Sequence, residues 1–417
     1  MRVLLLGGGG REHALGWKLA QSPLLTELIS APGNPGLASL GETVDVNPLD
    51  PESVAAFASE RGIDLVVIGP EAPLAAGVVD ALDASGIPAF GPTASGARLE
   101  ASKSYAKEIM ARAGVPTAAA RVFTDVDVAD SYLDQIGGPY VVKADGLAAG
   151  KGVLVTTDKN AAKAWATACL GGAFGDAGST VVIEEHLDGR EVSVFALVDG
   201  ERALPLAPAR DYKRLRDADE GPNTGGMGSF SPVDDLPHDL VDRTIVAVIE
   251  PVLDALAVDD VSYRGFLYVG LMLTDDGPKV LEFNCRMGDP EAQAILPLLD
   301  EDLLELLAAA SAGALPDRAL RWSDTAAVDV VLASAGYPAA PERGAVISGV
   351  ANAENHPDAL VIHAGTAEID AGLVTAGGRV LNVVGLGDTV EVARSAAYAA
   401  VDEIEFAGMQ MRTDIGR

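Results

Sequence analysis

The chain has 417 residues, of which 48% are hydrophobic and 22% charged, a composition typical of a folded globular protein. Its length is enough for about three domains with a sizeable core. The 61 acidic and 30 basic residues give a formal net charge of −31, which argues against nucleic acid or an anionic membrane as a partner, because both would be repelled. Few lysines and many aspartates suit a high-salt cytoplasm, although acidic proteins of ordinary cells share this composition.

The first apolar run, residues 2–6, is too short for a secretory signal and leads into a glycine turn. No run approaches the ~20 apolar residues of a membrane span. Cys169 and Cys285 are the only cysteines, so we expect no disulfide framework and a cytoplasmic location. The five histidines are scattered and give no zinc-binding spacing.

The first hundred residues alternate apolar runs with helical stretches, which predicts a doubly wound parallel sheet with ligands at the carboxyl ends of its strands. Gly69-Pro70-Glu71 lies at such an end, although a plain turn would look the same. The glycine run at 7–10 invites a dinucleotide-binding interpretation. That interpretation is disfavoured because Glu12 stands at the third glycine of the fingerprint and the second strand lacks an acid for the ribose. The N-terminus of the helix that follows is still suited to binding an anion. The expected strands are 2–6, 28–30, 63–70 and 87–92, and the expected helices are 10–21, 51–60 and 73–85.

A small-residue loop between Lys143 and Lys151 joins two valine-rich runs, which predicts a β-hairpin. Its glycines allow backbone N–H groups to approach an anion closely. It is not a Walker loop, because a strand follows it and Gly152 replaces the serine or threonine. The alternative is a flexible hairpin with two solvated lysines. Since the chain has only 9 lysines against 21 arginines, two lysines around one loop favour triphosphate binding.

The middle of the chain predicts further helices and strands around one unusual loop. Residues 210–228 are too polar for a core and too rich in glycine for a helix, and long loops of this kind are usually functional. Beyond about residue 325, short strands and a final helix suggest a small closing domain. The expected helices are 102–113, 160–170, 240–256 and 388–404, and the expected strands are 181–183, 191–195, 266–272 and 279–286.

Glu282, Asn284 and Arg286 alternate along one predicted strand, so their side chains share one face. A carboxylate and an amide oxygen are ligands that Mg²⁺ accepts when it shares substrate phosphates. An arginine one step further can bind a phosphate or a developing oxyanion. The alternative is an amphipathic strand whose polar face lies in water.

Together these segments resemble the ATP-grasp superfamily and, within it, the phosphoribosylamine–glycine ligase (glycinamide ribonucleotide synthetase) family of purine synthesis. The resemblance covers essentially the whole chain. The glycine hairpin is shared widely among ATP-grasp enzymes, whereas the segments 221–228 and 282–290 are far more specific. The matching segments are Gly7–His13, Gly69–Leu74, Lys143–Gly152, Asp211–Arg214, Gly221–Gly228, Glu282–Pro290 and Arg412–Gly416.

The resemblance implies a role for each matching residue. Arg286 and Lys143 would be catalytic, and Glu282 and Asn284 would bind Mg²⁺ or Mn²⁺. The ATP-binding residues would be Lys103, Lys143, Gly146, Gly150, Lys151, Gly152, Glu184, Glu185, Leu187 and Glu191. The substrate-binding residues would be Gly9, Gly10, Glu71, Asp211, Lys213, Asn223, Thr224, Gly225, Gly226 and Arg286. The chain departs from the family pattern at Arg210, where glutamine is expected, and at Met287, where an aromatic residue is expected.

The resemblance also implies a domain organisation. A Rossmann-like domain would cover 1–101, an ATP-grasp domain 102–325 with a lid at about 120–192, and a small mixed α/β domain 326–417. We expect a cytoplasmic monomer whose partners are ATP, glycine and 5-phosphoribosylamine. ATP would phosphorylate glycine, and the amine would then displace phosphate from glycyl phosphate to form the amide.

Three other functions remain alternatives. A related ATP-grasp ligase that activates bicarbonate or formate is disfavoured by residues 221–228. A nucleotide sensor without turnover would not need Glu282, Asn284 and Arg286 together. An NAD oxidoreductase is disfavoured by Glu12.

Overall fold

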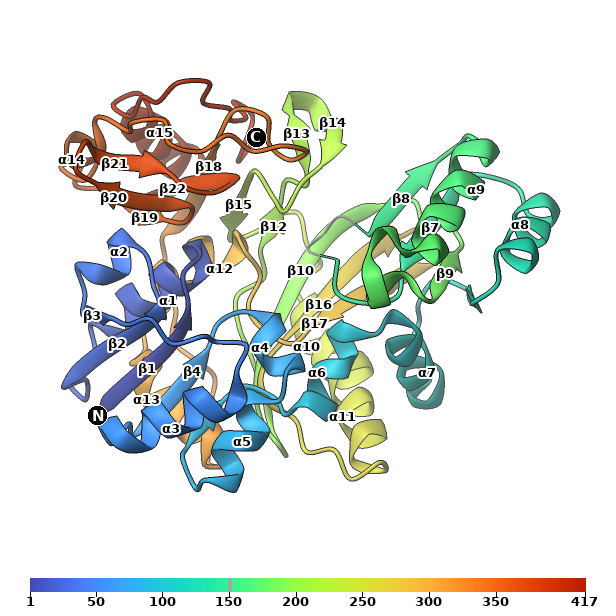
Figure 1. Ribbon diagram of the computed structural model, residues 1–417, viewed down its shortest axis with the longest axis horizontal. Coiled ribbons are helices and arrows are strands. Elements are labelled where there is room, and N and C mark those ends of the chain that lie inside the picture. The colour runs from blue at the N-terminus through green and yellow to red at the C-terminus, as the bar shows by residue number, and fades with distance from the viewer. Residues whose placement is uncertain (149–151) are drawn as a thin grey trace.

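The computed structural model of the protein describes residues 1–148 and 152–417. Its N-terminal part is built around a parallel five-stranded sheet. Its elements are β1 (Arg2–Gly7), α1 (Gly10–Leu19), β2 (Glu27–Pro32), α2 (Pro35–Ala38), β3 (Glu42–Thr43), α3 (Pro51–Arg61), β4 (Leu65–Ile68), α4 (Glu71–Ala75), α5 (Val78–Ala84), β5 (Ala89–Phe90) and α6 (Ala94–Ala101). The strand order is β3-β2-β1-β4-β5, which confirms the predicted doubly wound sheet (Figure 1). The order reverses between β1 and β4, and ligands bind at such switch points.

After Arg2, strand β1 is apolar and fully buried, as expected for a strand of a parallel sheet that is covered on both faces. Leu4 and Leu6 pack with residues of α3 and α5, including Val54 and Leu82. Val3 and Leu5 point the other way and pack against α1 through residues that include Leu15. The apolar run at 2–6 therefore belongs to a central strand.

The prediction of a single helix over residues 73–85 is wrong. Residues 73–85 do not form a single helix, because Gly77 adopts a left-handed conformation with φ of +86° between α4 and α5. A residue without a Cβ atom takes this conformation at little steric cost, so the chain turns there.

The central part contains two antiparallel sheets. The outer sheet has the order β6-β9-β7-β8, and the inner sheet has the order β11-β10-β16-β17. The predicted glycine hairpin is present, because β7 and β8 pair from Tyr140 with Thr156 to Lys143 with Val153. The elements are α7 (Lys103–Ala113), β6 (Ala120–Phe123), α8 (Val126–Gln135), β7 (Tyr140–Ala144), β8 (Val153–Thr156), α9 (Lys159–Ala168), β9 (Val181–Glu184), β10 (Arg190–Asp199), β11 (Ala203–Pro205), β16 (Arg264–Thr274) and β17 (Gly277–Asn284).

The predicted helix over 240–256 is interrupted by a π-helical turn, Ile245–Ile249, which lies between α10 (Leu240–Thr244) and α11 (Glu250–Ala257). Two further helices follow the inner sheet, α12 (Glu291–Ile295) and α13 (Leu303–Ser311). None of the helices in the described ranges is both long and apolar enough to span a membrane.

The segment 210–228 is not the irregular loop that its composition predicts. It contains β12 (Arg210–Asp211), β13 (Arg214–Arg216), β14 (Glu220–Asn223) and the start of β15 (Gly228–Ser231). Strands β12 and β15 extend the C-terminal sheet, whose order is β12-β15-β18-β22-β19, while β13 and β14 form a separate hairpin. The other elements of the C-terminal part are β18 (Ala326–Ala333), α14 (Val350–Ala353), β19 (Ala359–His363), β20 (Thr366–Ile369), β21 (Gly372–Thr375), β22 (Arg379–Gly387) and α15 (Val390–Val401).

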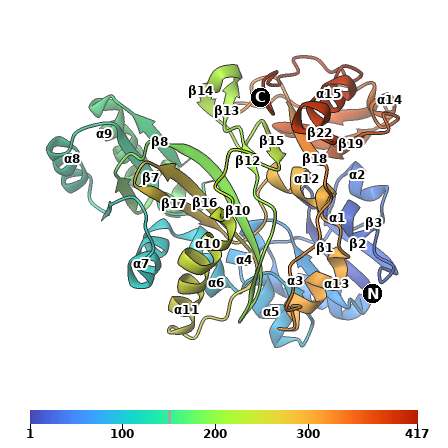
Figure 2. The ribbon, with the colours of Figure 1, turned by 180° about the vertical axis from the view of Figure 1, so that it is seen from behind.

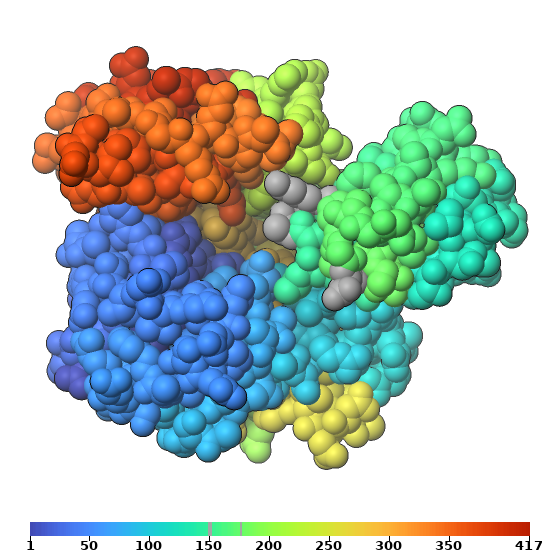
Figure 3. All heavy atoms as spheres, in the orientation of Figure 1, coloured from blue at the N-terminus to red at the C-terminus, as the bar shows by residue number. Residues whose placement is uncertain are grey.

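The three parts surround a recess. In Figures 1 and 2 the outer sheet projects from the rest of the molecule, and the C-terminal sheet lies above the N-terminal sheet. The space-filling view shows the hollow between the blue N-terminal part, the orange C-terminal part and the green outer sheet (Figure 3). The inner sheet forms its floor, so residues far apart in sequence meet there.

Candidate active site

A cavity of about 390 Å³ lies in this recess. Many of the residues predicted to bind ATP, metal or substrate line it: Glu71, Lys103, Gly146, Gly152, Glu184, Asp211, Lys213, Thr224, Gly225, Glu282, Asn284 and Arg286. They come from the N-terminal sheet, α7, the outer sheet, the inner sheet and the segment 210–228. The fold therefore gathers one site from every part of the chain, including the C-terminal part, whose strand β22 contributes Arg379.

One end of the cavity is built where α7 meets the glycine hairpin. Ser102 caps α7 by accepting the N–H of Tyr105 at 3.2 Å, and it donates to Asp145 Oδ2 at 3.0 Å. Asp145 also accepts the backbone N–H of Ser104 at 2.5 Å. This places Lys103 Nζ 3.1 Å from the carbonyl oxygen of Gly146. Burial lowers the pKa of Lys103, and Glu282 opposes that shift.

Lys143 is buried on β7 and does not line the cavity. Its Nζ lies 2.8 Å from Glu184 Oε2, while Lys107 Nζ lies 3.2 Å from the other oxygen of the same carboxylate. Two cations thus share one buried acid, which leaves excess positive charge beside the cavity. Lys107 and Glu184 both line it. The sequence interpretation missed Lys107, although it lies one helical turn after Lys103 and on the same face of α7.

Glu282 and Asn284 alternate on β17, and both line the cavity as predicted for one face of a strand. In the orientation that satisfies its hydrogen bonds, the Asn284 amide donates to Phe283 O and to Glu100 Oε1, each at 3.1 Å. Its oxygen is then the remaining acceptor. The described residues contain no cluster of three or more histidine, cysteine or acidic side chains that could hold a metal alone. One carboxylate and one amide oxygen fit a divalent ion that takes its other ligands from phosphates and water.

Arg286 follows the end of β17 and lies between two carboxylates. Its Nη2 donates to Glu100 Oε1 at 2.6 Å, and its Nε donates to Glu71 Oε2 at 3.2 Å. Burial alone would raise the pKa of Glu71, but the charges of Arg286 and Arg11 lower it to about 2. The arginine and the Glu71 carboxylate are therefore both charged at neutral pH. Glu100 was not predicted, because it lies within a helix with no motif around it.

Asp211 and Lys213, from the segment 210–228, line the cavity as well. Lys213 Nζ lies 3.0 Å from Asp211 Oδ1 and 2.5 Å from Glu191 Oε2. These two acids raise the pKa of Lys213 although burial opposes them, so the lysine is charged. Glu191 was predicted to contact the ribose of ATP, but here it pairs with a residue predicted to bind the other substrate. The two predicted groups of residues are therefore in direct contact.

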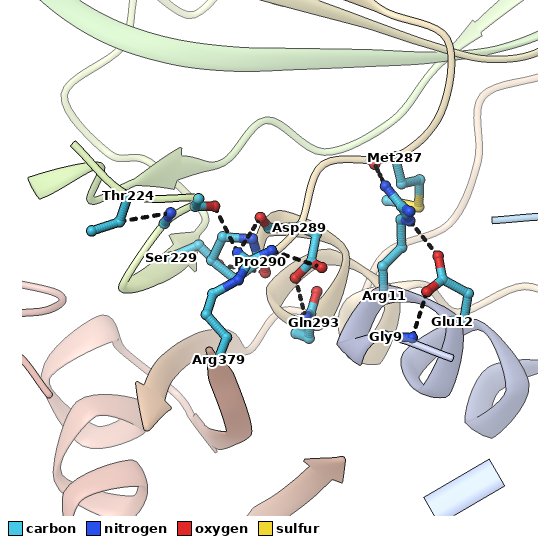
Figure 4. A network of polar contacts seen from close by, with 12 residues as sticks. Gly9, Arg11, Glu12, Thr224, Ser229, Met287, Asp289, Pro290, Gln293 and Arg379 are labelled. Carbon is cyan, nitrogen blue, oxygen red and sulfur yellow. Dashed lines mark hydrogen bonds and ion pairs between the residues drawn. The ribbon is translucent and has the colours of Figure 1, made fainter. Parts of the chain in front are cut away.

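The loop that carries Thr224, Gly225 and Gly226 is held by Arg379 from β22. Arg379 Nη1 donates to the carbonyl oxygens of Gly225 and Asp289, each at 2.6 Å, and its Nη2 lies 3.0 Å from Asp289 Oδ2. Figure 4 shows this arginine reaching Asp289, whose other carboxylate oxygen accepts from Gln293 at 2.9 Å. Arg379 and Asp289 line the cavity. Arg379 lies outside the segments that the motifs singled out.

Gly9 and Gly10 lie at the start of α1, next to the cavity but not in its lining. The carboxylate of Glu12 accepts the N–H of Gly9 at 2.7 Å and pairs with Arg11 Nε at 2.6 Å (Figure 4). A Cβ atom at Gly10 would lie 2.5 Å from the Asn382 amide nitrogen, so this glycine allows the C-terminal sheet to approach α1. Glu12 therefore already occupies one donor at the helix N-terminus predicted to bind an anion.

The remaining predicted residues lie around the cavity or outside the described ranges. Glu185 pairs with Lys279 at 3.2 Å, Leu187 is buried, and Asn223 ends β14. Gly226 adopts φ of +109°. Gly150 and Lys151 lie outside the residues that the structure describes.

The two departures from the family pattern are both accommodated. Arg210 Nη2 pairs with Asp235 Oδ1 at 2.9 Å, and its Nε donates to the Glu191 carbonyl at 3.2 Å, so its charge is compensated away from the cavity lining. Met287 is fully buried in the core beneath α12. Its carbonyl oxygen accepts from Arg11 at 3.3 Å and from Arg286 at 3.2 Å.

Comparison with known proteins agrees with this geometry. Three sequence profiles of phosphoribosylglycinamide synthetase match the chain, the N domain over 1–100, the ATP-grasp (A) domain over 101–292 and the C domain over 327–417. The chain is 50% identical over 416 residues to the phosphoribosylamine–glycine ligase of Mesorhizobium japonicum, covering 100% of this chain and 98% of the relative. It is 51% identical over 419 residues to that of Streptomyces coelicolor, with the same coverage.

Solved structures give the same result. The crystal structure of the phosphoribosylamine–glycine ligase from Thermotoga maritima matches with a TM-score of 0.86 at 37% identity, over 99% of this chain and 100% of that one. A biotin carboxylase domain from Hydrogenobacter thermophilus matches with a TM-score of 0.73 at 17% identity over 98% and 91% of the two chains, which shows a shared fold. Because the three profiles match in order along the chain, it belongs to the phosphoribosylglycinamide synthetase family, within the ATP-grasp class. The resemblance inferred from the sequence is confirmed.

Proposed function

We propose that the protein is an ATP-dependent ligase that joins glycine to 5-phosphoribosylamine, giving glycinamide ribonucleotide, ADP and phosphate in purine synthesis. The observation that carries the proposal is the composition of a single cavity. Lys103, Glu282, Asp211, Lys213 and Arg286 all line it, which places cations and acids from three separate segments around one space. A site that brings a nucleotide and an amine to one carboxylate needs such an arrangement. The names of the relatives support the same reaction.

We assign the nucleotide to the end formed by α7 and the hairpin. Lys103 and Lys143 would hold ATP phosphates, residues 146–152 would close over them, and Glu184, Glu185 and the Leu187 backbone would meet the adenine. Glu191 would reach the ribose. Glu282 and Asn284 would hold Mg²⁺, or Mn²⁺ in its place, which would neutralise charge on the phosphates.

We assign the amine to the opposite end of the cavity. Its phosphate and sugar would lie near Gly9, Gly10, Glu71, Asp211, Lys213 and residues 223–226, with Arg286 close to the glycine carboxylate. The proposed domains are 1–101, 102–325 with a lid at about 120–192, and 326–417, and the proposed assembly is a monomer in the cytoplasm.

The reaction would proceed in two steps. A bare carboxylate is a poor electrophile, so a glycine carboxylate oxygen would first attack the γ-phosphorus of ATP, releasing ADP and giving glycyl phosphate. The amine nitrogen would then attack the carbonyl carbon of glycyl phosphate, and the bond from that carbon to the phosphate oxygen would break as the amide forms. The protein supplies position and charge and no nucleophile. Arg286 and Lys143 would stabilise the negative charge, and closure of the site would exclude water from glycyl phosphate.

An ADP-release assay tests this proposal. The pure protein should release ADP when ATP, Mg²⁺, glycine and freshly generated 5-phosphoribosylamine are all present, and omission of glycine or of the amine should abolish it. Turnover that needs bicarbonate or formate instead of glycine would replace the proposal with the related ligase. Binding of ATP with no turnover under any of these conditions would point to a nucleotide sensor.

A further inference from the structure

The C-terminal segment Arg412–Asp414 contacts the β13–β14 hairpin, although the two are far apart in the sequence. Figures 1 and 2 both show the C-terminal end beside this hairpin. The segment belongs to the Arg412–Gly416 motif that the sequence comparison singled out. The proposed reaction assigns no role to it.

Arg412 is the centre of this contact, and its side chain is only 1% exposed. Its Nε and Nη2 donate to the two carboxylate oxygens of Asp414, each at 2.7 Å. Its Nη1 donates to Asp219 Oδ1 at 2.7 Å and to the Arg214 carbonyl at 3.3 Å. A planar guanidinium with several fixed donors suits this task, because it binds the tail, the first strand of the hairpin and the hairpin tip at once.

The tip of the hairpin receives further hydrogen bonds from the tail. Asp217 accepts the Thr413 N–H at 2.8 Å and the Thr413 hydroxyl at 2.5 Å, while the Ala218 N–H donates to Asp414 Oδ2 at 2.9 Å. Ala218 and Asp219 have φ of +55° and +54°. This left-handed conformation is unfavourable for residues with a Cβ atom. The surrounding contacts are therefore needed to hold the tip in this shape.

The same arginine also holds the strand that leads into the cavity. Its guanidinium lies 4.7 Å from the ring centre of Tyr212, and the Tyr212 hydroxyl accepts the Gly416 N–H at 3.0 Å. Side chains alternate along an extended strand, so Tyr212 faces the tail while Asp211 and Lys213 face the cavity. Both neighbours line the cavity, as does Thr224, whose N–H donates to the Lys213 carbonyl at 2.8 Å where the hairpin returns.

We propose that Arg412 is a positioning residue, which acts through Tyr212 and the hairpin to hold Asp211, Lys213 and Thr224 in the orientation that receives the amine substrate. The proposal rests on the proposed function, since it names the end of the cavity that binds 5-phosphoribosylamine. The nucleotide end is built by α7, the outer sheet and β17, and among the described residues the hydrogen bonds of Arg412–Asp414 reach none of these elements. Loosening the tail should therefore weaken the binding of the amine more than that of ATP, which the tail reaches only through the pair of Lys213 with Glu191.

The kinetic test compares three variants in the ADP-release assay. Arg412→Lys keeps the charge but removes the fork of donors. Asp219→Asn is the gentler variant, because Asp219 is 72% exposed and asparagine tolerates the left-handed conformation. Glu220→Gln is the control, since it removes the same charge one residue later, where the described structure gives the side chain no partner.

Arg412→Lys and Asp219→Asn should raise the KM for 5-phosphoribosylamine by about 10- to 100-fold, because small misplacements of binding groups have effects of this size. The KM for ATP should rise by a clearly smaller factor, because only Glu191 of the nucleotide residues pairs with Lys213. The Glu220→Gln values should stay near those of the unchanged protein. Equal rises in both KM values, or no rise in either, would overturn the positioning role.

Trypsin cleavage gives a second readout that does not depend on activity. Arg214 and Arg216 lie within β13, so release of the tail should speed cleavage there in Arg412→Lys and Asp219→Asn but not in Glu220→Gln. Unchanged cleavage rates would contradict the proposed contact. If the unchanged protein shows no turnover with glycine and the amine, the proposed function fails, and this readout still decides whether the tail holds the hairpin.

Discussion

Glu100 Oε1 lies 2.6 Å from Nη2 of Arg286, and this buried carboxylate holds the arginine in the wall of the cavity. Its other oxygen accepts the Cys285 N–H at 2.8 Å, so Glu100 binds both the backbone and the side chain of the segment that follows β17. Glu71 accepts from Nε of the same guanidinium at 3.2 Å. The direction of Arg286 is thus set by two acids of the N-terminal part.

Replacing Glu100 by glutamine should weaken the use of glycine. The change keeps the side-chain shape but removes one of the two charges that orient Arg286. We expect kcat/KM for glycine to fall by about 10- to 100-fold, at about 1.4 kcal/mol per decade. Glu108→Gln, an exposed change on α7, serves as the control. A folded Glu100→Gln protein with normal glycine kinetics would show that Arg286 does not depend on this contact.

Replacing Glu282 by glutamine separates a metal ligand from a surface acid. Glutamine preserves the strand but removes the charge that would hold Mg²⁺, so activity should fall by at least ~100-fold, because metal charge stabilisation contributes several kcal/mol to a transition state. Raising the Mg²⁺ concentration should restore part of the loss. Asp275→Asn, in the exposed turn before β17, should change little. Near-normal turnover in folded Glu282→Gln would remove the proposed metal site and Asn284 with it.

Isotope transfer tests the proposed intermediate. Glycine labelled with ¹⁸O in its carboxylate should pass one labelled oxygen to inorganic phosphate, because the bridging oxygen of glycyl phosphate leaves with the phosphoryl group. Mass spectrometry of the phosphate measures this transfer. Unlabelled phosphate would mean that ATP transferred its phosphoryl group to water or to another acceptor, which would refute the two-step reaction.

The histidine pair between α1 and β19 should make stability depend on pH. His13 Nδ1 accepts the His363 N–H at 2.7 Å, and burial lowers the pKa of His13 to about 3 and that of His363 to about 4. Unfolded histidines titrate near 6.5, so the unfolded chain binds protons that the folded chain does not. Stability from this pair is therefore complete above about pH 6.5 and falls as the pH decreases towards the folded values.

Urea unfolding at pH 7 and pH 5 measures this effect. Each histidine should contribute a slope of up to about 1.4 kcal/mol per pH unit below pH 6.5. His363→Gln should flatten the slope, whereas His238→Gln, at an exposed position, should not. Equal slopes in all three proteins would show that the pair does not control the pH dependence.

The net charge of −31 predicts a response to salt. If the acidic surface is an adaptation to a high-salt cell, molar KCl should raise the unfolding temperature by screening the repulsion between carboxylates. Potassium chloride is preferable to sulfate, which strengthens burial in any protein. An unfolding temperature that does not change between low and molar KCl would discard this adaptation.

The sequence by itself determined the parts of the protein that depend on local patterns. The apolar run of β1, the hairpin of β7 and β8 and the alternation of Glu282 and Asn284 on β17 could all be predicted. Each of these features arises from the alternation of side chains along a strand or from glycines at a turn. Both are properties of residues that are neighbours in the sequence. The family resemblance extended the prediction of the fold to the whole chain, because the motifs of the family follow one another in a fixed order.

Only the tertiary structure decided how remote segments meet. Residues 210–228 are predicted to be a loop, yet β15 pairs with β18, about a hundred residues later in the chain, and β12 pairs with β15. Lys107 and Glu100 have no motif of their own and enter the cavity through the packing of α6 and α7. Arg379 reaches Asp289 across 90 residues of sequence. Such contacts depend on the three-dimensional arrangement of whole elements, which no periodicity within a short segment records.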